Sequence, residues 1–340
     1  MKKILLILIM LLALAGGVAG YAYYQLFRKP VVAETAWLYI RCDQVVTDSV
    51  GKQPQLTALP EGREMSLACQ LNQFDQKLAS GSLEGAYRLK EGMSAMDVAR
   101  KLTRRQQDPV RLTFTGVRLK EQLAGRLARP LMCDSLSVLE AMTAPEFLAE
   151  AGLDEANIGI VFLPDTYEVF WNITPAKLME RMFSEYRHFW NEERRLQAEA
   201  LHLTPREVSI LASIAEEETT GRQERGTVAR LYWNRLQQGM LLQADPTVKF
   251  ALGDFGLRRI LLAHLTVDSP YNTYRYAGLP PGPIRIVEKA TIDTILQSQP
   301  NDYLYMCARP DFSGRHNFAT TLTEHNRNAA AYHAALAGRN

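Results

Sequence analysis

The first 29 residues constrain the fold most, because they contain a long run without a charged side chain. The 24 residues from Ile4 to Phe27 are uncharged and mostly apolar, and a basic pair stands on either side of them. A helix of about 20 apolar residues crosses a bilayer whose hydrocarbon core is about 30 Å thick. The sequence therefore predicts a single transmembrane helix within residues 1–29, with the remainder of the chain on one side of the membrane.

A cleavable signal peptide is the alternative interpretation of this run. The apolar region of a signal peptide has about 7–15 residues, fewer than are found here, and the small residues from Ala15 to Gly20 make a poor cleavage site. The tyrosines that follow are typical of a membrane interface. We therefore expect an uncleaved anchor, with Lys2 and Lys3 in the cytoplasm and everything after Lys29 outside it.

Net charge and cysteine spacing exclude two classes of function. The formal net charge is only +2 and the basic residues are scattered, whereas a nucleic-acid binder carries a basic patch. The four cysteines, at positions 42, 69, 133 and 307, show no CxxC spacing, so we expect no metal site. Cys42 and Cys69 fall in one predicted domain, where a disulfide and two buried free thiols both remain open.

The sequence of residues 30–110 predicts a small domain of mixed strands and helices. Trp37 to Val46 and Gly85 to Leu89 have strand character, and Met65 to Leu78 has helical potential between them. Ser94 is placed to cap a further helix from Ala95 to Leu102. A β-α-α-β unit of this size is common and by itself says nothing about function.

Residues 111–203 predict a connecting region of helices and short strands. Strands are expected at Val110 to Gly116 and within the aromatic segment Phe162 to Trp171. A long helix should begin at Thr174 and Pro175 and run to about Ala200, because its apolar residues follow helical spacing.

Residues 204–340 predict a compact α+β domain. Helices are expected from Thr204 to about Thr219 and from Gln223 to Gln238. Asp302 to Ala319 predicts a hairpin, and Thr321 should cap a final helix that ends near Ala337. The whole chain is therefore expected to be α+β.

One carboxylate of the helix that opens this last domain is predicted to face the core. The helix has an apolar stripe, formed by Val208, Ile210, Leu211, Ile214 and Ala215. Glu218 falls within the stripe, Glu217 at its edge and Glu216 outside it. A carboxylate that faces an apolar interior is costly unless it is paired or neutral, so it usually has a function. An ion pair between Glu218 and a buried arginine, such as Arg225 or Arg235, is the structural alternative.

Several common catalytic motifs are absent from the sequence. It contains no HExxH, GxSxG, P-loop or GxGxxG motif, so zinc proteolysis, serine hydrolysis and nucleotide binding lose their usual support. What remains is one core-facing glutamate beside proline-stiffened loops rich in Tyr, Asn, Thr and Gln. Burial raises the pKa of a carboxyl group, as a general acid near neutral pH requires. Amide, hydroxyl and aromatic groups suit a polyhydroxylated ligand, so the combination indicates cleavage of a glycosidic bond.

A set of ordered motifs resembles the YceG-like endolytic murein transglycosylases (MltG). The matching segments are Leu211-Ala-Ser-Ile-Ala-Glu-Glu-Glu-Thr219, Asn234-Arg-Leu236, Gln243-Ala-Asp-Pro-Thr-Val248, Pro270-Tyr-Asn-Thr-Tyr274, Gly278-Leu-Pro-Pro-Gly-Pro-Ile284, His316-Asn-Phe318 and Glu324-His-Asn326. The resemblance is strong over residues 205–330 and fair at Leu163 to Tyr167 and Gly85 to Ser94. It is weak over residues 36–80.

This resemblance implies a single-pass protein of the inner membrane whose catalytic part lies in the periplasm. It implies a LysM-like subdomain at residues 30–110, a connecting region at 111–203 and a catalytic domain at 204–340, without a cofactor. Members of the family cleave the β-1,4 bond between N-acetylmuramic acid and N-acetylglucosamine in nascent glycan strands, leaving a 1,6-anhydro end. Peptidoglycan strands and cell-wall synthesis proteins are the implied partners.

The resemblance also assigns roles to particular residues. The catalytic acid is the glutamate directly before the threonine of the Glu-x-Glu-Thr motif, which is Glu218 here. It protonates the glycosidic oxygen and then, as a base, assists attack by the C6 hydroxyl, so a second carboxylate is not needed. The candidate sugar contacts are Gln243, Tyr271, Asn272, Tyr274 and His316, with a structural role open for Tyr271 and His316. Asp245 is expected to cap a helix rather than to act as a second catalytic carboxylate.

Four positions depart from the family pattern, and two other functions compete with the one implied. The family has Thr or Ser at Ala244, Gly at Arg315, Thr at Asn317 and Glu at Thr115, which affects substrate contacts but not Glu218. One competing function is a hydrolytic muramidase, in which water replaces the C6 hydroxyl. The other is a non-catalytic, membrane-anchored scaffold that binds glycan.

Overall fold

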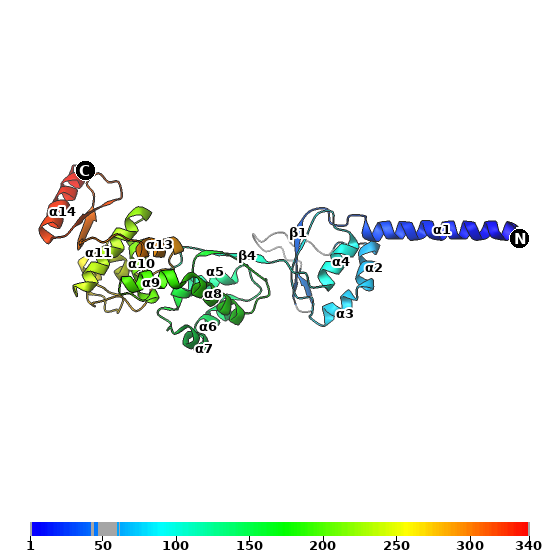
Figure 1. Cartoon of the computed structure of the whole chain (residues 1–340), viewed down its shortest axis with the longest axis horizontal. Coiled ribbons are helices and arrows are strands. Elements are labelled where there is room, and N and C mark those ends of the chain that lie inside the picture. The colour runs from blue at the N-terminus through cyan, green and yellow to red at the C-terminus, as the bar shows by residue number, and fades with distance from the viewer. Residues whose placement is uncertain (1, 42–43, 47–59, 61, 339–340) are drawn as a thin grey trace. The chain divides into compact units, whose positions relative to one another are not determined.

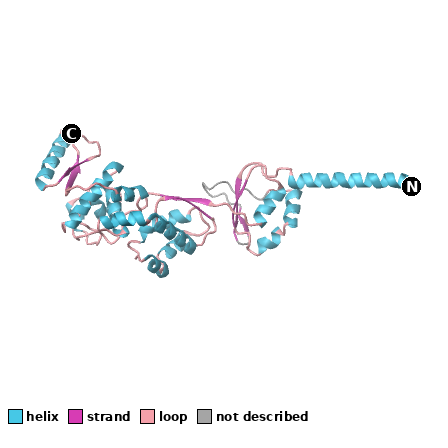
Figure 2. Ribbon diagram, in the orientation of Figure 1, coloured by secondary structure: helices cyan, strands magenta, loops and turns pink. Residues whose placement is uncertain are grey.

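The chain folds into two compact units, which are described separately. The computed structural model describes residues 2–41, 44–46, 60 and 62–338 (Figure 1). The first unit comprises Met1–Leu112, Pro130–Cys133 and Tyr167–Ile173, and the second comprises Thr113–Arg129, Asp134–Thr166 and Thr174–Asn340. Helices dominate the chain and its strands form small sheets, so the fold is α+β, as predicted (Figure 2).

The first element is an apolar helix, α1 (Lys2–Phe27), which contains the uncharged run of the sequence. Its most apolar window has a mean hydropathy of 2.5, and none of that window is buried inside the protein. Among the residues that the structure describes, α1 is the one helix long and apolar enough to cross a membrane.

The rest of the first unit is a small sheet packed with three helices. Strands β1 (Ala36–Arg41), β2 (Gln44–Val46) and β3 (Gly85–Leu89) form an antiparallel sheet in the order β2-β1-β3. The helices are α2 (Arg63–Leu71), α3 (Phe74–Ala79) and α4 (Ala95–Thr103), and α4 has the predicted cap at Ser94. Sheet and helices share one core, which includes Leu38, Tyr87, Met65, Phe74 and Leu102.

Two segments with a predicted helical or strand character each contain two elements. Met65 to Leu78 forms α2 and α3 because Gln73 adopts a left-handed conformation, with φ of 57°, that ends helical geometry. The segment Trp37 to Val46 contributes two strands. Cys42 lies outside the described residues, and the predicted alternatives of a disulfide with Cys69 or two free thiols therefore lie outside them too.

Residues 110–200 contain two paired strands and five α-helices. The elements are β4 (Val110–Phe114), α5 (Lys120–Ala128), α6 (Ser135–Met142), α7 (Pro145–Ala151), the 3₁₀ turn η1 (Ile158–Val161), β5 (Asp165–Val169), α8 (Pro175–Phe189) and α9 (Glu192–Ala200), with β4 paired to β5. The prediction of one long helix from Thr174 to Ala200 is wrong. Asn191 starts a new helix, because its side chain accepts a hydrogen bond from the Arg194 backbone nitrogen at 3.0 Å.

The C-terminal part of the second unit surrounds α10 (Pro205–Glu218). Its other elements are η2 (Arg222–Glu224), α11 (Arg225–Gln237), α12 (Asp245–Leu252), η3 (Leu262–Thr266), α13 (Lys289–Leu296), β6 (Tyr305–Ala308), β7 (His316–Ala319) and α14 (Leu322–Ala337). The antiparallel hairpin β6–β7 and the cap of α14 at Thr321 confirm the predictions for this segment.

Helix α10 lies at the centre of this core. Thr204 and Glu207 form the predicted capping box, with the Glu207 carboxylate accepting from the Thr204 nitrogen at 2.8 Å. The helix packs against α9, α11, α12 and α13, and all nine residues from Val208 to Glu216 are buried. A helix buried on all sides holds its last turn in a fixed place, and that turn carries the three glutamates.

Candidate active site

The three adjacent glutamates at the end of α10 have different surroundings. The prediction that Glu216 lies outside the buried face is wrong, since its side chain is 0% exposed. Helical phase failed here because α10 is enclosed on every side, so that no face of it points to solvent. The Glu217 side chain is 15% exposed, and Glu218, the last residue of the helix, is partly exposed.

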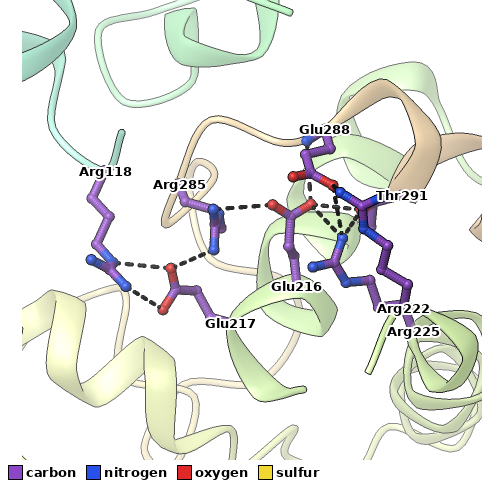
Figure 3. A network of polar contacts seen from close by, with 8 residues as sticks. All are labelled: Arg118, Glu216, Glu217, Arg222, Arg225, Arg285, Glu288 and Thr291. Atoms are coloured by element: carbon purple, nitrogen blue, oxygen red, sulfur yellow. Dashed lines mark hydrogen bonds and ion pairs between the residues drawn. The ribbon is translucent and has the colours of Figure 1, made fainter. Parts of the chain in front are cut away.

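Glu216 is held by cations and hydrogen-bond donors (Figure 3). Arg285 Nη2 lies 3.1 Å from its Oε1, and Arg225 Nη1 lies 3.5 Å from its Oε2. Its Oε2 also accepts hydrogen bonds from the Thr291 hydroxyl at 2.6 Å and the Glu288 backbone nitrogen at 3.2 Å. The buried charge of Glu216 is therefore compensated, as a buried carboxylate requires.

Glu217 belongs to the same network (Figure 3). Arg118 donates to its carboxylate through both Nε, at 3.0 Å, and Nη2, at 2.8 Å. Arg285 Nη1 donates to the same carboxylate at 3.0 Å, so that Arg285 bridges Glu217 and Glu216. Two-point contacts from a planar guanidinium fix orientation as well as charge. Together these contacts hold the last turn of α10.

Glu218 points instead into a pocket of about 270 Å³. The other lining residues are Leu231, Tyr232, Arg235, Leu242, Gln243, Asp245, Tyr274, Met306, Cys307, Ala308 and His316. In the part of the chain that the structure describes, the buried Oε2 of Glu218 has no hydrogen-bond partner. A buried acceptor without a donor is rare in folded proteins and marks a functional or strained site.

The predicted alternative, an ion pair with Arg225 or Arg235, does not describe Glu218. Arg225 contacts Glu216 and Glu288. Arg235 uses Nε and Nη1 on the backbone carbonyls of Leu304, at 2.6 Å, and Leu242, at 2.7 Å. Arg235 thus lines the pocket as a cation anchored by main-chain contacts, whereas the ion-pair interpretation fits Glu216.

These surroundings raise the pKa of the Glu218 carboxyl to about 7. Burial is the largest cause, and the charge of Asp245 is the next. Lys249, the Tyr232 hydroxyl and Arg235 act in the opposite direction but do not cancel the rise. A carboxyl group with such a pKa is half protonated at neutral pH, which suits a group that gives and takes a proton.

Asp245 lines the same pocket, and its predicted role as a helix cap is wrong. Ala244 occupies the N-cap position of α12, and Asp245 is the first helical residue. Its carboxylate accepts a hydrogen bond from the Tyr274 hydroxyl at 2.6 Å. The sequence Asp-Pro at a helix start is typical of a cap, so local pattern alone did not indicate that this side chain turns toward the pocket.

Gln243, Tyr274 and His316 lie in the Glu218 pocket. Gln243 has φ of 54°, a left-handed conformation that non-glycine residues adopt rarely. His316 Nδ1 lies 3.0 Å from the carboxylate of Glu224, so this ring both lines the pocket and is held by a partner.

Asn272 and Tyr271 lie elsewhere. Asn272 is fully buried, and its amide donates to the carbonyls of Leu265, at 2.9 Å, and Val267, at 2.8 Å. Its side-chain oxygen accepts from the Tyr274 nitrogen at 3.1 Å, so Asn272 positions Tyr274 rather than lining the pocket. Tyr271 lines a second pocket of the same unit.

The pocket also contains residues that the sequence analysis did not select as substrate contacts. Tyr232 and Arg235 come from the buried helix α11, and Cys307 comes from β6. Helical spacing could have identified the first two, because positions 228, 231, 232 and 235 share one face.

The chain is similar to several known proteins. The YceG-like family matches residues 56–331. An endolytic murein transglycosylase of Bacillus subtilis is 30% identical over 75% of this chain and 74% of its own length. One from Streptococcus pneumoniae D39 is 27% identical over 73% of this chain, which spans only half the length of that relative.

A crystal structure of a YceG-like protein from Listeria monocytogenes is also similar. It has a TM-score of 0.55 and 27% sequence identity, covering 77% of this chain and 89% of that one. The family match covers most of the chain, and the sequence and structure comparisons agree. The chain belongs to the YceG-like family.

Proposed function

We propose that this protein is an endolytic lytic transglycosylase of peptidoglycan, in which Glu218 is the general acid and then the general base. The observation that carries the proposal is the Glu218 carboxyl itself. It lines a polar pocket, one of its oxygens is buried without a hydrogen-bond partner among the described residues, and its pKa is raised to about 7. The activity named for the relatives from Bacillus subtilis and Streptococcus pneumoniae supports the substrate class.

The first step is protonation of the bridging oxygen between N-acetylmuramic acid and N-acetylglucosamine. The protonated Glu218 gives its proton to that oxygen as the bond to the anomeric carbon breaks, and the departing sugar keeps the proton as its 4-hydroxyl. Positive charge then develops at the anomeric carbon. Asp245 lines the same pocket and carries a negative charge that favours this transition state.

The second step uses the carboxylate that the first step leaves. Glu218 accepts the proton of the muramic C6 hydroxyl as the C6 oxygen bonds to the anomeric carbon. This closes a 1,6-anhydro ring, consumes no water and returns Glu218 to its protonated form. A pKa near 7 suits both halves of the cycle, because neither protonation state is strongly favoured at neutral pH.

We also propose how the chain reaches its substrate. Helix α1 serves as an uncleaved inner-membrane anchor, and the remainder of the chain lies in the periplasm, beside newly made glycan. Residues 30–110 serve as a LysM-like glycan-binding subdomain. The element order β1, α2, α3 and β3, with β1 antiparallel to β3, supports this second part.

The experiment that tests the activity is mass spectrometry of sacculi digested with the purified protein. We expect fragments that end in 1,6-anhydro-N-acetylmuramic acid, and no such fragments with Glu218→Gln. Release of fragments at an undiminished rate by Glu218→Gln would contradict the role of Glu218. No release by either protein would favour a non-catalytic scaffold.

A hydrolytic muramidase is the second candidate, and the position of Asp245 favours it. A carboxylate that shares the pocket with the acid could activate water. Hydrolysis adds one water to the product, so the same spectra distinguish the two reactions. A reducing end in place of the anhydro end would select hydrolysis.

A further inference from the structure

A second pocket of the same unit, of about 220 Å³, is not used by the proposed mechanism. Its apolar floor includes Leu123, Ile158 and Ile286. One wall is aromatic, formed by Phe250 and Tyr271, whose ring centroids lie 4.7 Å apart. Glu218 does not line this pocket. Tyr271, which was predicted as a sugar contact of the Glu218 site, lines it instead.

The walls of this pocket are held rigidly. The Tyr271 hydroxyl donates to the Ala156 carbonyl at 3.3 Å. A Cβ at Gly282 would lie 1.8 Å from the same carbonyl oxygen, so only glycine allows the proline-rich loop to approach this closely. Pro283, the next residue, lines the pocket. The site is therefore formed before any ligand arrives.

A smaller hollow of about 50 Å³ adjoins this pocket. It shares Arg118 and Phe250 with the second pocket. It is also lined by Glu217 and Pro246, the neighbours in sequence of Glu218 and Asp245. Asp245 and Phe250 both belong to α12 and are about 7.5 Å apart along its axis, from a rise of about 1.5 Å per residue. Each of the three hollows is therefore lined in part by α12.

The charges around the second pocket favour a neutral ligand. Arg118 and Arg285 are both paired with Glu217, and Lys120 is paired with Glu155. Such pairs leave oxygen and nitrogen atoms at the rim but little net charge to attract an anion. Hydrogen-bonding groups beside an aromatic wall suit a pyranose ring with hydroxyl and acetamido groups.

We infer that this second pocket is a binding subsite for a sugar of the same glycan strand, remote from the bond that is cleaved. The inference rests on the proposed function, because it takes a glycan strand as the substrate. A strand that occupies the pocket must extend beyond the Glu218 site along α12. The subsite therefore favours long strands over short fragments.

Binding measurements test this inference, with the full chain in detergent and in a Glu218→Gln background that prevents turnover. The probes are glycan strands of two length classes, long strands and short fragments, each prepared with and without peptide stems. Glu121→Trp places a bulky side chain at the exposed rim of the pocket. Gln122→Trp is the matched control, because Gln122 is the next residue of α5, is also exposed and does not line the pocket.

A second pair of variants removes or keeps the aromatic wall. Tyr271→Ala deletes the ring, and Tyr271→Phe retains it without the hydroxyl. We expect Glu121→Trp and Tyr271→Ala to weaken binding of long strands about tenfold while binding of short fragments stays within about twofold. Gln122→Trp should match the parent, and Tyr271→Phe should lie close to it.

Two results would overturn the subsite. One is equal binding of long strands by Glu121→Trp and Gln122→Trp. The other is a loss seen only with strands that keep their peptide stems, which would assign the pocket to peptide. Failure of the Glu218→Gln parent to bind any glycan would overturn the proposed function as well, so the two failures are distinguishable.

Discussion

The network of Glu216 and Glu217 and the pocket of Glu218 lie next to each other at the end of α10, but they give a carboxylate opposite surroundings. Glu216 is the more deeply buried, with a side chain that is 0% exposed, but two arginines and two further donors compensate its charge. Glu218 keeps some exposure to the pocket, and its buried Oε2 has neither a hydrogen bond nor an ion pair within the described part of the chain. Burial alone therefore does not separate the two carboxylates, whereas ion pairing does, because Glu216 has two ion pairs and Glu218 has none among the described residues.

The difference also shows how one helix end can carry two ion-paired glutamates and a third that lines a pocket. Three glutamates at the negative end of a helix dipole would fray it. Arg118, Arg225 and Arg285 remove that cost at the first two glutamates. The third can then remain uncompensated, because the turn that carries it is already held.

Glu218→Gln should have the largest effect on activity. Loss of the proton donor should slow release of anhydro fragments about 10²–10⁴-fold. Below pH 4.5 the unfolding free energy should change little, because the Glu218 carboxyl is then protonated and no ion pair involving Glu218 is lost among the described residues. Glu217→Gln is the matched control and should keep most of the rate, measured by chromatography of released muropeptides. Equal losses in the two variants would break the distinction between network and pocket.

Glu216→Gln should have the largest effect on stability. It leaves Arg225 and Arg285 short of a buried counter-charge, which costs about 3 kcal/mol of unfolding free energy. Denaturant titration of the variant beside Glu218→Gln measures the difference. A Glu216→Gln protein as stable as the wild type would show that the network contributes nothing to the fold.

Features that depend on residues close together in the sequence could be predicted, whereas contacts between residues far apart in the sequence could not. The caps at Ser94, Thr204 and Thr321 depend on residues within one turn, so pattern was sufficient. The burial of Glu216 depends on Arg285 and Thr291, which lie about 70 residues away. Helical phase assumes that one face meets solvent, and α10 has no such face.

The same limit applies to the pocket. The order of motifs indicated the family, but not which motif reaches Glu218. Tyr271 and Tyr274 belong to one short motif, yet they line different pockets, because the buried Asn272 between them fixes the turn of the loop. Asp245 followed the pattern of a cap, and only the position of Tyr274 shows where its carboxylate points.

The raised pKa of Glu218 predicts how stability depends on pH. The folded-state pKa is about 7 and the ordinary value is 4.5. The folded state therefore holds this proton more tightly, so the stabilisation is complete below pH 4.5 and is lost as the pH rises through about 7. The wild type should lose about 2–3 kcal/mol relative to Glu218→Gln across this range. Parallel curves for the two proteins would contradict the raised pKa.

Asp245→Asn should have a smaller effect, on the pH profile. Its charge raises the pKa of Glu218, so its removal should lower that pKa and shift the alkaline limb of the rate profile to lower pH. At neutral pH we expect a loss of about threefold, because less of the acid is protonated. A loss as large as that of Glu218→Gln would instead make Asp245 a catalytic partner and favour hydrolysis.

Arg118→Gln should have the smallest effect, and it tests where the network ends. Arg118 is 37% exposed, so solvent screens its two-point contact with Glu217. A pair of this kind contributes about 0.5 kcal/mol. Arg285, whose side chain is 18% exposed, continues to hold both glutamates when Arg118 is lost, so the last turn of α10 should stay in place. Thermal unfolding measures the stability change, and a loss comparable to that of Glu216→Gln would mean that Arg118 is as essential to the turn as the buried members of the network.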